Sequence, residues 1–239
     1  MKFKIATWNI GEDETNDKNA VNLKSYKFIE KTIKEYNIDI ICFQEAITSS
    51  DTISAIKDFV KNTTELIYNS EFEYAPSHIN IGSMMGVVTC SKYPIVKDSI
   101  VMFDNPNIEY RKSETVVYKM HDKGFIISHI DSIPLVIANG HGIPFFAFKR
   151  NALDFIDMYQ KTEKNLMNKM KENNNFIVIG DINYTSFKEI FPNIYNITNN
   201  NIDGITYTRC STGEDMQLDY IMTSKNIKVS DNKIIDNRF

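Results

Sequence analysis

Polar side chains that could bind a metal ion or move a proton follow several strand-like apolar segments of this sequence. The five places at which they end or follow such a segment are Asn9, Glu45, Asn139 with His141, Asp181 with Asn183, and Asp219. Taken one at a time, each has an ordinary explanation, because a polar residue at a strand end is usually a turn or cap residue. Five strand ends that each supply a carboxylate, an amide or an imidazole favour one shared site.

The chemistry of this set is dominated by oxygen ligands. It combines carboxylates and amides with one imidazole and no thiolate, which suits Mg²⁺, Mn²⁺ or Ca²⁺ better than zinc or copper. A cation of that kind commonly holds phosphate oxygens while a carboxylate activates water. Because side chains alternate along a strand, Asn139 and His141 are expected to point to one side, as are Asp181 and Asn183.

The elements that must position these groups are predicted to be strands alternating with amphipathic helices. The apolar positions that recur every three or four residues and predict the first helix are Leu23, Tyr26, Ile29, Ile33 and Tyr36. The nearly continuous apolar run 38–43 predicts a strand covered on both faces. Asp51 is predicted to cap a short helix, and a long helix is predicted from Phe148 to Lys171.

The remaining strands are predicted from short apolar runs between turn signals. The section from about residue 66 to residue 138 has the pattern of antiparallel strands. Later strands are predicted at 176–179, 219–222 and 227–229. Neither a repeat nor a break in composition divides the chain, so a single domain over residues 1–239 is expected.

Length and composition describe an ordinary soluble protein. The 239 residues include 27 Lys+Arg and 31 Asp+Glu, for a net charge of −4, and no apolar run approaches the roughly 20 residues of a membrane span. The three cysteines lie far apart and are expected to be reduced and buried. The alternating N-terminus differs from a signal peptide, so a cytoplasmic location is expected. The acidic balance shows no broad basic footprint for nucleic acid, but a metal ion and a few local cations can still hold a phosphate.

Six short motifs carry a resemblance to a known family. They are Thr7-Trp8-Asn9, Phe43-Gln44-Glu45, the segment 86–95 (GVVTCSKYPI), Asn139-Gly140-His141, Gly180-Asp181-Ile182-Asn183 and Gln217-Leu218-Asp219-Tyr220-Ile221. In this order the sequence resembles the endonuclease/exonuclease/phosphatase superfamily, with its deoxyribonuclease I-like fold. The resemblance implies an α/β protein, a four-layer α/β/β/α sandwich of two mixed sheets with helices outside, and metal-dependent phosphoester cleavage.

Roles for individual residues follow from the resemblance alone. It implies that Glu45 is the principal Mg²⁺ ligand, with Mn²⁺ or Ca²⁺ as substitutes, and that Asn9 lies beside it in the metal shell. Asp181 resembles the carboxylate that aligns or deprotonates the attacking water, and Asn183 the amide that holds this water or a phosphate oxygen. In the same way His141 resembles the imidazole that donates to the phosphate or the leaving oxygen, with Asn139 supporting it.

The sequence departs from the family pattern after Asp219. This residue resembles the carboxylate that orients a second, C-terminal histidine in a Ser-Asp-His element. The twenty residues after Asp219 contain no histidine, and Ser230-Asp231-Asn232 is the nearest echo of that element. We therefore expect the sequence to end before this element and its activity to be reduced.

The substrate is less readable than the reaction. Tyr110 and Arg111 are candidates for phosphate contacts, and His78 falls where the family varies a substrate loop, although a solvated surface or a loop histidine explains them equally well. The leading hypothesis is an Mg²⁺-dependent phosphodiesterase that cleaves nucleic acid. A phosphomonoesterase or lipid phosphodiesterase on the same fold, and a catalytically silent copy that binds nucleic acid or protein, are the alternatives.

Overall fold

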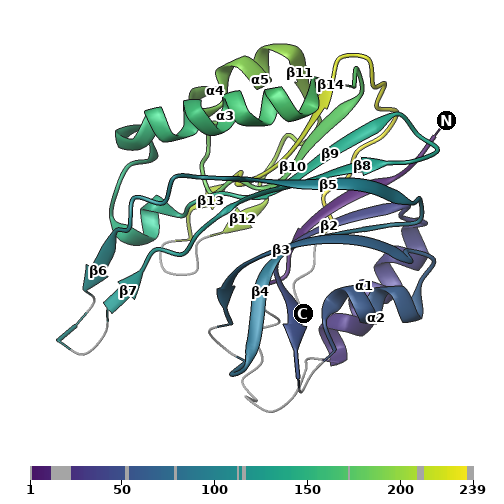
Figure 1. Cartoon of the computed structure of the whole chain (residues 1–239), viewed down its shortest axis with the longest axis horizontal. Coiled ribbons are helices and arrows are strands. Elements are labelled where there is room, and N and C mark those ends of the chain that lie inside the picture. Colours follow the sequence, from purple (N-terminus) through teal and green to yellow (C-terminus); the bar gives the residue numbers. More distant parts are fainter. Residues whose placement is uncertain are drawn as a thin grey trace.

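Two β-sheets packed face to face form the centre of the molecule. The computed structural model describes residues 2–11, 23–51, 54–77, 80–111, 113–114, 117–171, 173–208 and 213–235. Helices cover the outer face of each sheet, so the four-layer α/β/β/α arrangement predicted from the resemblance is confirmed (Figure 1).

The smaller sheet has four strands. In spatial order they are β1 (Ile5–Asn9), β2 (Ile40–Ser50), β4 (Ser83–Ser91) and β3 (Tyr68–Pro76). β1 and β2 run parallel, whereas the other pairs are antiparallel. The helices α1 (Leu23–Tyr36) and α2 (Ile56–Thr63) cover its outer face, and the predicted first helix is thereby confirmed.

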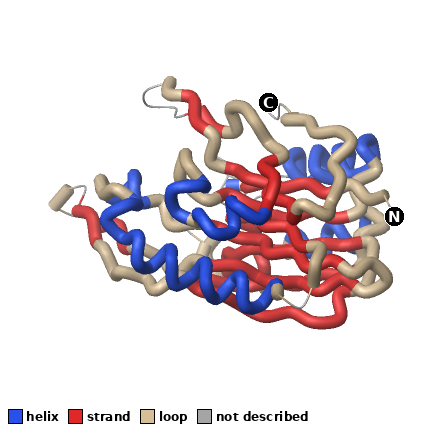
Figure 2. Tube along the Cα trace, turned by 90° about the horizontal axis from the view of Figure 1, so that it is seen from above, coloured by secondary structure: helices blue, strands red, loops and turns tan. Residues whose placement is uncertain are grey.

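The larger sheet has six strands. In spatial order they are β11 (Thr198–Asn200), β14 (Asp219–Ser224), β10 (Phe176–Asp181), β9 (Leu135–His141), β8 (Gly124–Ile130) and β5 (Ile95–Met102). Only β9 and β10 are parallel to each other. The helices that cover its outer face are α3 (Ile156–Met170), α4 (Phe187–Ile190) and α5 (Pro192–Ile197), and Figure 2 shows α3 lying across the strands.

Smaller elements lie in the connections between these strands and helices. The two-stranded ribbons are β6 (Glu109–Arg111) with β7 (Val117–Lys119), and β12 (Tyr207–Thr208) with β13 (Asp215–Met216). Two 3₁₀ helices, η2 (Phe145–Phe148) and η3 (Ala152–Phe155), lie between β9 and α3.

Alternation along the central strands divides the core between the layers. In β2, Ile41 and Phe43 pack against α1 and α2, whereas Ile40 and Cys42 pack against the other sheet. The prediction that residues 38–43 form a strand covered on both faces is confirmed. The same alternation in β9 and β10 directs their inner side chains to the space between the sheets, and the last of these are polar.

Two predicted helix boundaries are wrong. The segment predicted as one helix from Phe148 to Lys171 contains the end of η2, the separate η3 and then α3, because Lys149 adopts a left-handed conformation (φ 54°) that ends the first turn. The Asn151 side chain then accepts a hydrogen bond from the Leu153 amide and starts a new turn. Asp51 does not cap α2, which begins at Ile56 after Ala55.

The predicted strand at 227–229 is also wrong. The chain turns after Ser224, and residues 225–235 carry no strand. The reason lies in the sheet, where β14 already pairs with β10 on one side and with β11 on the other, so the edge that another strand would occupy is filled.

Two further findings concern the described residues only. None of the helices in these ranges is long and apolar enough to cross a membrane. Cys42 and Cys90 are buried free thiols, as expected, whereas Cys210 lies outside the described residues.

Candidate active site

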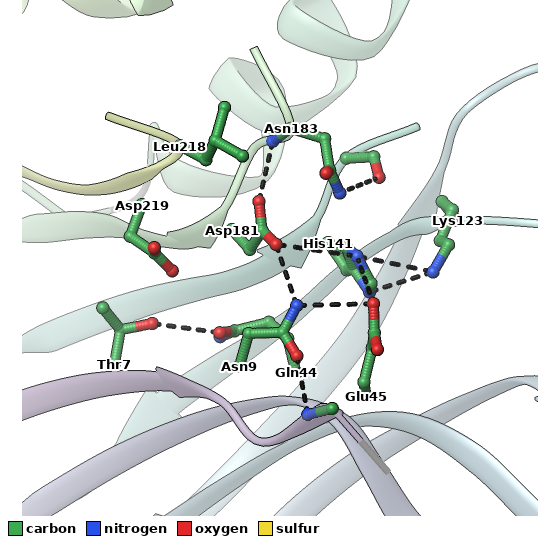
Figure 3. Close-up of polar contacts among 12 residues, drawn as sticks. Thr7, Asn9, Gln44, Glu45, Lys123, His141, Asp181, Asn183, Leu218 and Asp219 are labelled. Carbon is green, nitrogen blue, oxygen red and sulfur yellow. Dashed lines mark hydrogen bonds and ion pairs between the residues drawn. The ribbon is translucent and has the colours of Figure 1, made fainter. Parts of the chain in front are cut away.

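The polar strand ends converge at one edge of the sandwich because of strand direction. β1, β9 and β10 deliver their carboxyl ends there, and antiparallel β14 begins there. The prediction that the second strand ends before Glu45 is wrong, because β2 continues to Ser50 and Glu45 lies in its middle. Asp219 is the pairing partner of Asp181, which in turn pairs with His141. Figure 3 shows the side chains of Asn9, Glu45 and these three residues pointing toward one another.

Glu45 reaches this edge through an irregularity in β2. The pairing between β2 and β4 shifts register between Phe43 and Ala46, and Glu45 adopts a positive φ of 48°. Such a bulge re-aims a side chain that regular alternation would send elsewhere. The carboxylate of Glu45 is one-third exposed, with Oε1 3.5 Å from Nε2 of His141.

Asn9 joins the carboxylates through its amide nitrogen. Its Nδ2 donates to Asp181 Oδ2 at 2.8 Å and approaches Glu45 Oε1 at 3.4 Å, while its Oδ1 accepts from the Gly11 amide at 3.0 Å. The nitrogen therefore faces the carboxylates, and direct metal ligation by Asn9 would require the amide to turn so that Oδ1 faces them.

A tight turn after β10 holds Asp181 and Asn183 together. The Asn183 backbone amide donates to Asp181 Oδ1 at 2.8 Å, and Asn183 has a positive φ of 56°. The two residues are close because of this turn, so the expectation that strand alternation aligns them is wrong in its reason. Just before this turn, Gly180 lets β10 lie close to β9, because a Cβ on Gly180 would lie 2.1 Å from the Gly140 carbonyl oxygen.

The buried Asp181 and the half-buried Asp219 form a pair of neighbouring carboxyl groups. Burial, followed by the charge of Asp219, raises the pKa of Asp181 above its ordinary value, although hydrogen bonds from Asn9 and Asn183 act in the opposite direction. Burial likewise raises the pKa of Asp219, and a hydrogen bond with the Thr206 side chain lowers it. Because two neighbouring carboxylates repel each other, the pair is stabilised by a proton shared between them or by a bound cation.

His141 is fully buried and contacts two groups that sequence analysis did not single out. Its Nδ1 lies 2.7 Å from the Tyr74 hydroxyl, and the ammonium of Lys123 lies 3.0 Å from Nδ1 and 3.4 Å from Nε2. Burial and the adjacent Lys123 lower the pKa of His141 well below its ordinary value. A neutral imidazole therefore faces the carboxylates. Lys123 was detectable in principle, because it precedes the strand that pairs with His141.

Asn139 lies between the sheets and connects them. Gln44 Nε2 donates to Asn139 Oδ1 at 2.8 Å, and Asn139 Nδ2 donates to the Val88 carbonyl at 3.0 Å. Asn139 and His141 do face the same sheet, as alternation predicts. The hydrogen bonds found for the Asn139 side chain all go to β2 and β4, so its contacts support the sandwich rather than His141 directly.

The candidate substrate residues have different positions. Tyr110 lies beneath the Lys149 ammonium, 4.7 Å from its ring centroid, and Arg111 is exposed and donates to the Glu114 carbonyl. His78 lies outside the described residues.

A hollow of about 310 Å³ opens beside Asn183. The residues that line it are Phe145, Phe146, Lys149, Arg150, Asn151, Ala152, Asn183 and Tyr184. Tyr110 contributes indirectly through its contact with Lys149. The hollow therefore combines two cations and aromatic side chains next to the site.

Thr206 is a hydrogen-bond partner of Asp219, for which the resemblance predicted an imidazole. Its hydroxyl also accepts a hydrogen bond from the Asp219 backbone amide at 3.1 Å. Ser230, Asp231 and Asn232 are exposed loop residues, and the Asn232 side chain donates to the Asn201 carbonyl. These three residues are thus engaged outside the carboxylate cluster.

The donor set is compatible with a hard divalent cation. Within the described ranges, no group of three or more His, Cys, Asp and Glu side chains is arranged as a complete ligand shell. Mg²⁺ is commonly bound by only one or two carboxylates, with water and substrate oxygens as its other ligands. Glu45 and Asp181, both contacted by one amide nitrogen, meet that requirement and lie in a cluster rich in negative charge.

Two mixed sheets packed face to face, with an acidic site at their common edge, define a deoxyribonuclease I-like fold. The chain belongs to the endonuclease/exonuclease/phosphatase family, whose sequence profile matches residues 6–237. Members of this family hydrolyse phosphoesters and generally use divalent metal ions. No curated protein matches the sequence.

Solved structures similar to this chain share its fold at low identity. A family protein from Leptotrichia buccalis is 16% identical with a TM-score of 0.60, covering 95% of this chain and 89% of the other. A humanized TDP2 from D. rerio is 14% identical with a TM-score of 0.57, covering 93% and 83%. A mannosyl-6-phosphatase from Bacteroides thetaiotaomicron is 12% identical with a TM-score of 0.57, covering 94% and 86%.

Proposed function

We propose that this chain is an Mg²⁺-dependent phosphodiesterase that cleaves nucleic acid by in-line attack of water. The observation that carries the proposal is the convergence of Glu45, Asp181 and His141, with Asn9 bridging the two carboxylates. These groups come from both sheets, and a purely structural role would not require three ionisable side chains to face one another.

Asp181 is the proposed base. Its raised pKa brings it toward neutral pH, where a carboxylate accepts a proton from water most effectively. The Asn183 amide holds the turn in which Asp181 lies, since its Nδ2 donates to the Gly142 carbonyl at 3.1 Å. His141 is the proposed donor to a phosphate oxygen, because its Nε2 faces the carboxylates. Asp219 completes the acidic pair.

Glu45 is the proposed principal ligand of Mg²⁺, for which Mn²⁺ or Ca²⁺ would substitute, and Asn9 would join it with its amide turned. When bound there, the ion supplies positive charge that stabilises the phosphoryl oxygens. The negative charge around Asp181 supports this assignment.

The hollow beside Asn183 supports nucleic acid as the substrate. Lys149 and Arg150 can attract phosphates, while the exposed ring of Phe146 offers a surface on which a base can stack. A solved neighbour named as a mannosyl-6-phosphatase supports phosphomonoesters as the second candidate. The buried free thiols agree with the cytoplasmic location that we propose.

The proposal is tested by assaying the chain against plasmid DNA, single-stranded DNA, RNA, a phosphoinositide and mannose 6-phosphate, with Mg²⁺ or with EDTA. We expect cleavage of a nucleic acid only with the metal. Lys149→Ala with Arg150→Ala should raise KM. Lys164→Ala, which removes an exposed cation from α3, is the control and should leave KM unchanged. Faster turnover of mannose 6-phosphate would favour the monoesterase, and metal-independent binding without turnover would favour a silent copy.

A further inference from the structure

The two ring nitrogens of His141 face groups with different hydrogen-bonding abilities. Nε2 lies 3.5 Å from Glu45 Oε1 and 4.0 Å from Asp181 Oδ2, and an ionised carboxylate only accepts hydrogen bonds. Nδ1 lies 2.7 Å from the Tyr74 hydroxyl, which can donate or accept. Both contacts are satisfied together when Nε2 carries the ring proton and the Tyr74 hydroxyl donates to Nδ1.

Lys123 reinforces this arrangement from a different direction. Its ammonium approaches both ring nitrogens, at 3.0 and 3.4 Å, and lies 4.1 Å from the centroid of the Tyr74 ring. An ammonium only donates hydrogen bonds, and the shorter of its two contacts is to Nδ1, so an Nδ1 without a proton suits Lys123 as well as Tyr74. Lys123 and Tyr74 are both buried, so water competes little for these positions.

We propose that Tyr74 is a positioning residue, whose hydroxyl holds His141 in the Nε2-protonated tautomer so that a fixed N–H donor faces the substrate phosphoester. The inference rests on the proposed function and deepens it. A preorganised donor directed at developing charge stabilises the transition state without reorganisation.

The tautomer also decides which residue donates a hydrogen bond and which accepts the proton of the attacking water. With its proton on Nε2, His141 has no lone pair toward the carboxylates and cannot take a proton from the attacking water there. Proton acceptance is therefore left to Asp181, whose Oδ2 lies 4.0 Å from the same nitrogen. Tyr74 acts through His141 in this scheme.

The tautomer can be read directly by NMR. Long-range ¹⁵N–¹H spectra of the ¹⁵N-labelled full chain, with His141→Asn for assignment, should show a protonated Nε2 and an unprotonated Nδ1, both in EDTA and in Mg²⁺. Tyr74→Phe removes only the hydroxyl and should produce a mixture of tautomers. The same variant should lower kcat by about 10–100-fold, the usual cost of losing an orienting partner, with KM unchanged.

Tyr159→Phe is the matched control. Tyr159 is also buried, and its hydroxyl has no hydrogen-bond partner among the described residues, so its loss should leave the His141 spectrum and kcat unchanged. A protonated Nδ1 in the wild-type chain would overturn the inference, whatever the folding of the variants. Tyr74→Phe with the wild-type tautomer and kcat would also overturn it. If the wild-type chain cleaves no phosphoester, the proposed function fails, while the wild-type spectrum still decides the tautomer.

Discussion

Asp181 combines a fixed orientation with a raised pKa. It lies at the end of a buried strand, next to Asp219, and accepts hydrogen bonds from Asn9 and from the Asn183 amide. The hydrogen bonds hold the carboxyl group in one orientation, while burial and the second carboxyl group raise its pKa. A group of this kind is suited to proton transfer rather than to stability.

Replacing Asp181 by Asn should separate its contribution to catalysis from its contribution to stability. We expect Asp181→Asn to fold and to lower kcat by about 10²–10⁴, the usual contribution of a positioned acid or base. Turnover under saturating Mg²⁺ is the measurement. Asp131→Asn, an exposed carboxylate at the opposite end of β8, should retain full activity. Wild-type turnover of Asp181→Asn would show that this carboxylate is structural.

The acidic pair predicts a pH dependence of stability. Because the pKa of Asp181 is raised from 3.8 to about 7, the folded chain binds more protons than the unfolded chain within that window. The contribution of the acidic pair to the stability of the metal-free protein should therefore fall as pH rises from about 4 to about 7. His141 acts in the opposite direction below about pH 6.5, because its pKa is lowered in the folded chain. Asp219→Asn should remove the contribution of Asp219 itself and the part of the Asp181 shift that its charge causes, while the larger effect of burial on Asp181 remains. The substitution should stabilise the protein at pH 8 by about 1.4 kcal/mol for each unit of pKa shift that it relieves.

Urea unfolding in EDTA at pH 5 and pH 8 measures this effect. If the free energy of unfolding of Asp219→Asn, relative to that of the wild-type chain, does not increase from pH 5 to pH 8, the raised pKa values are contradicted. Equal destabilisation by Asp219→Asn at both pH values would instead indicate that the hydrogen bond with Thr206 dominates at this position.

At the scale of elements, the bulge in β2 interrupts the regular pairing with β4 and directs the carboxylate of Glu45 into the site. Glu45 has a left-handed backbone conformation, which is unfavourable for a residue with a Cβ, and its side chain reaches the site as a result. Strain of this kind persists where the surrounding structure over-determines it, and it clusters at functional sites.

Two substitutions at Glu45 should separate charge from strain. Mg²⁺ should raise the Tm of the wild-type chain, and EDTA should reverse the rise, because a ligand of the folded state stabilises it. Both Glu45→Gln and Glu45→Gly should lose this response. Only Glu45→Gly should also gain about 1 kcal/mol of metal-free stability, since glycine adopts the positive φ without strain.

Glu30→Gln on α1 is the control for the metal response and should keep it. A normal Mg²⁺-dependent rise in Tm for Glu45→Gln would mean that another group is the principal ligand.

At the scale of the whole molecule, the site depends on how the two sheets are joined. Asn139 in the larger sheet and Gln44 in the smaller one form a buried amide pair immediately behind the carboxylates. Thr7 donates to the oxygen of Gln44, which extends the connection to β1. This network joins the two sheets behind the carboxylates.

Asn139→Ala should therefore act on stability. We expect a loss of about 1–3 kcal/mol, because the substitution removes the oxygen that accepts from one N–H of the buried Gln44 amide, while the bond from Gln44 to the Cys42 carbonyl remains. The kcat of the folded fraction should stay near the wild-type value. Gln44→Leu combined with Asn139→Leu should recover part of the lost stability in urea unfolding. A fall in kcat at unchanged stability would instead support a direct role of Asn139 at His141.

Periodicity and motif order were sufficient to predict the layers of this protein and most of its candidate site. Strand alternation is a local property, so the two-faced burial of residues 38–43 and the shared direction of Asn139 and His141 followed from the sequence. The start of α3 at Ile156, rather than at Phe148, did not follow from the sequence. The left-handed conformation of Lys149 ends η2, and the apolar periodicity continues across that position without marking it.

Contacts between distant segments were decided only by the tertiary structure. Tyr74 lies 67 positions from His141, Lys123 lies 18 positions from it, and neither belongs to a recognisable motif. Thr206 became the neighbour of Asp219, and β11 became the neighbour of β14, through the closure of loops whose sequences do not specify their partners. Local sequence therefore determined which chemical groups end the strands. Only the packing of the two sheets decided which atoms face one another, because hydrogen-bond partners and burial are properties of the assembled layers.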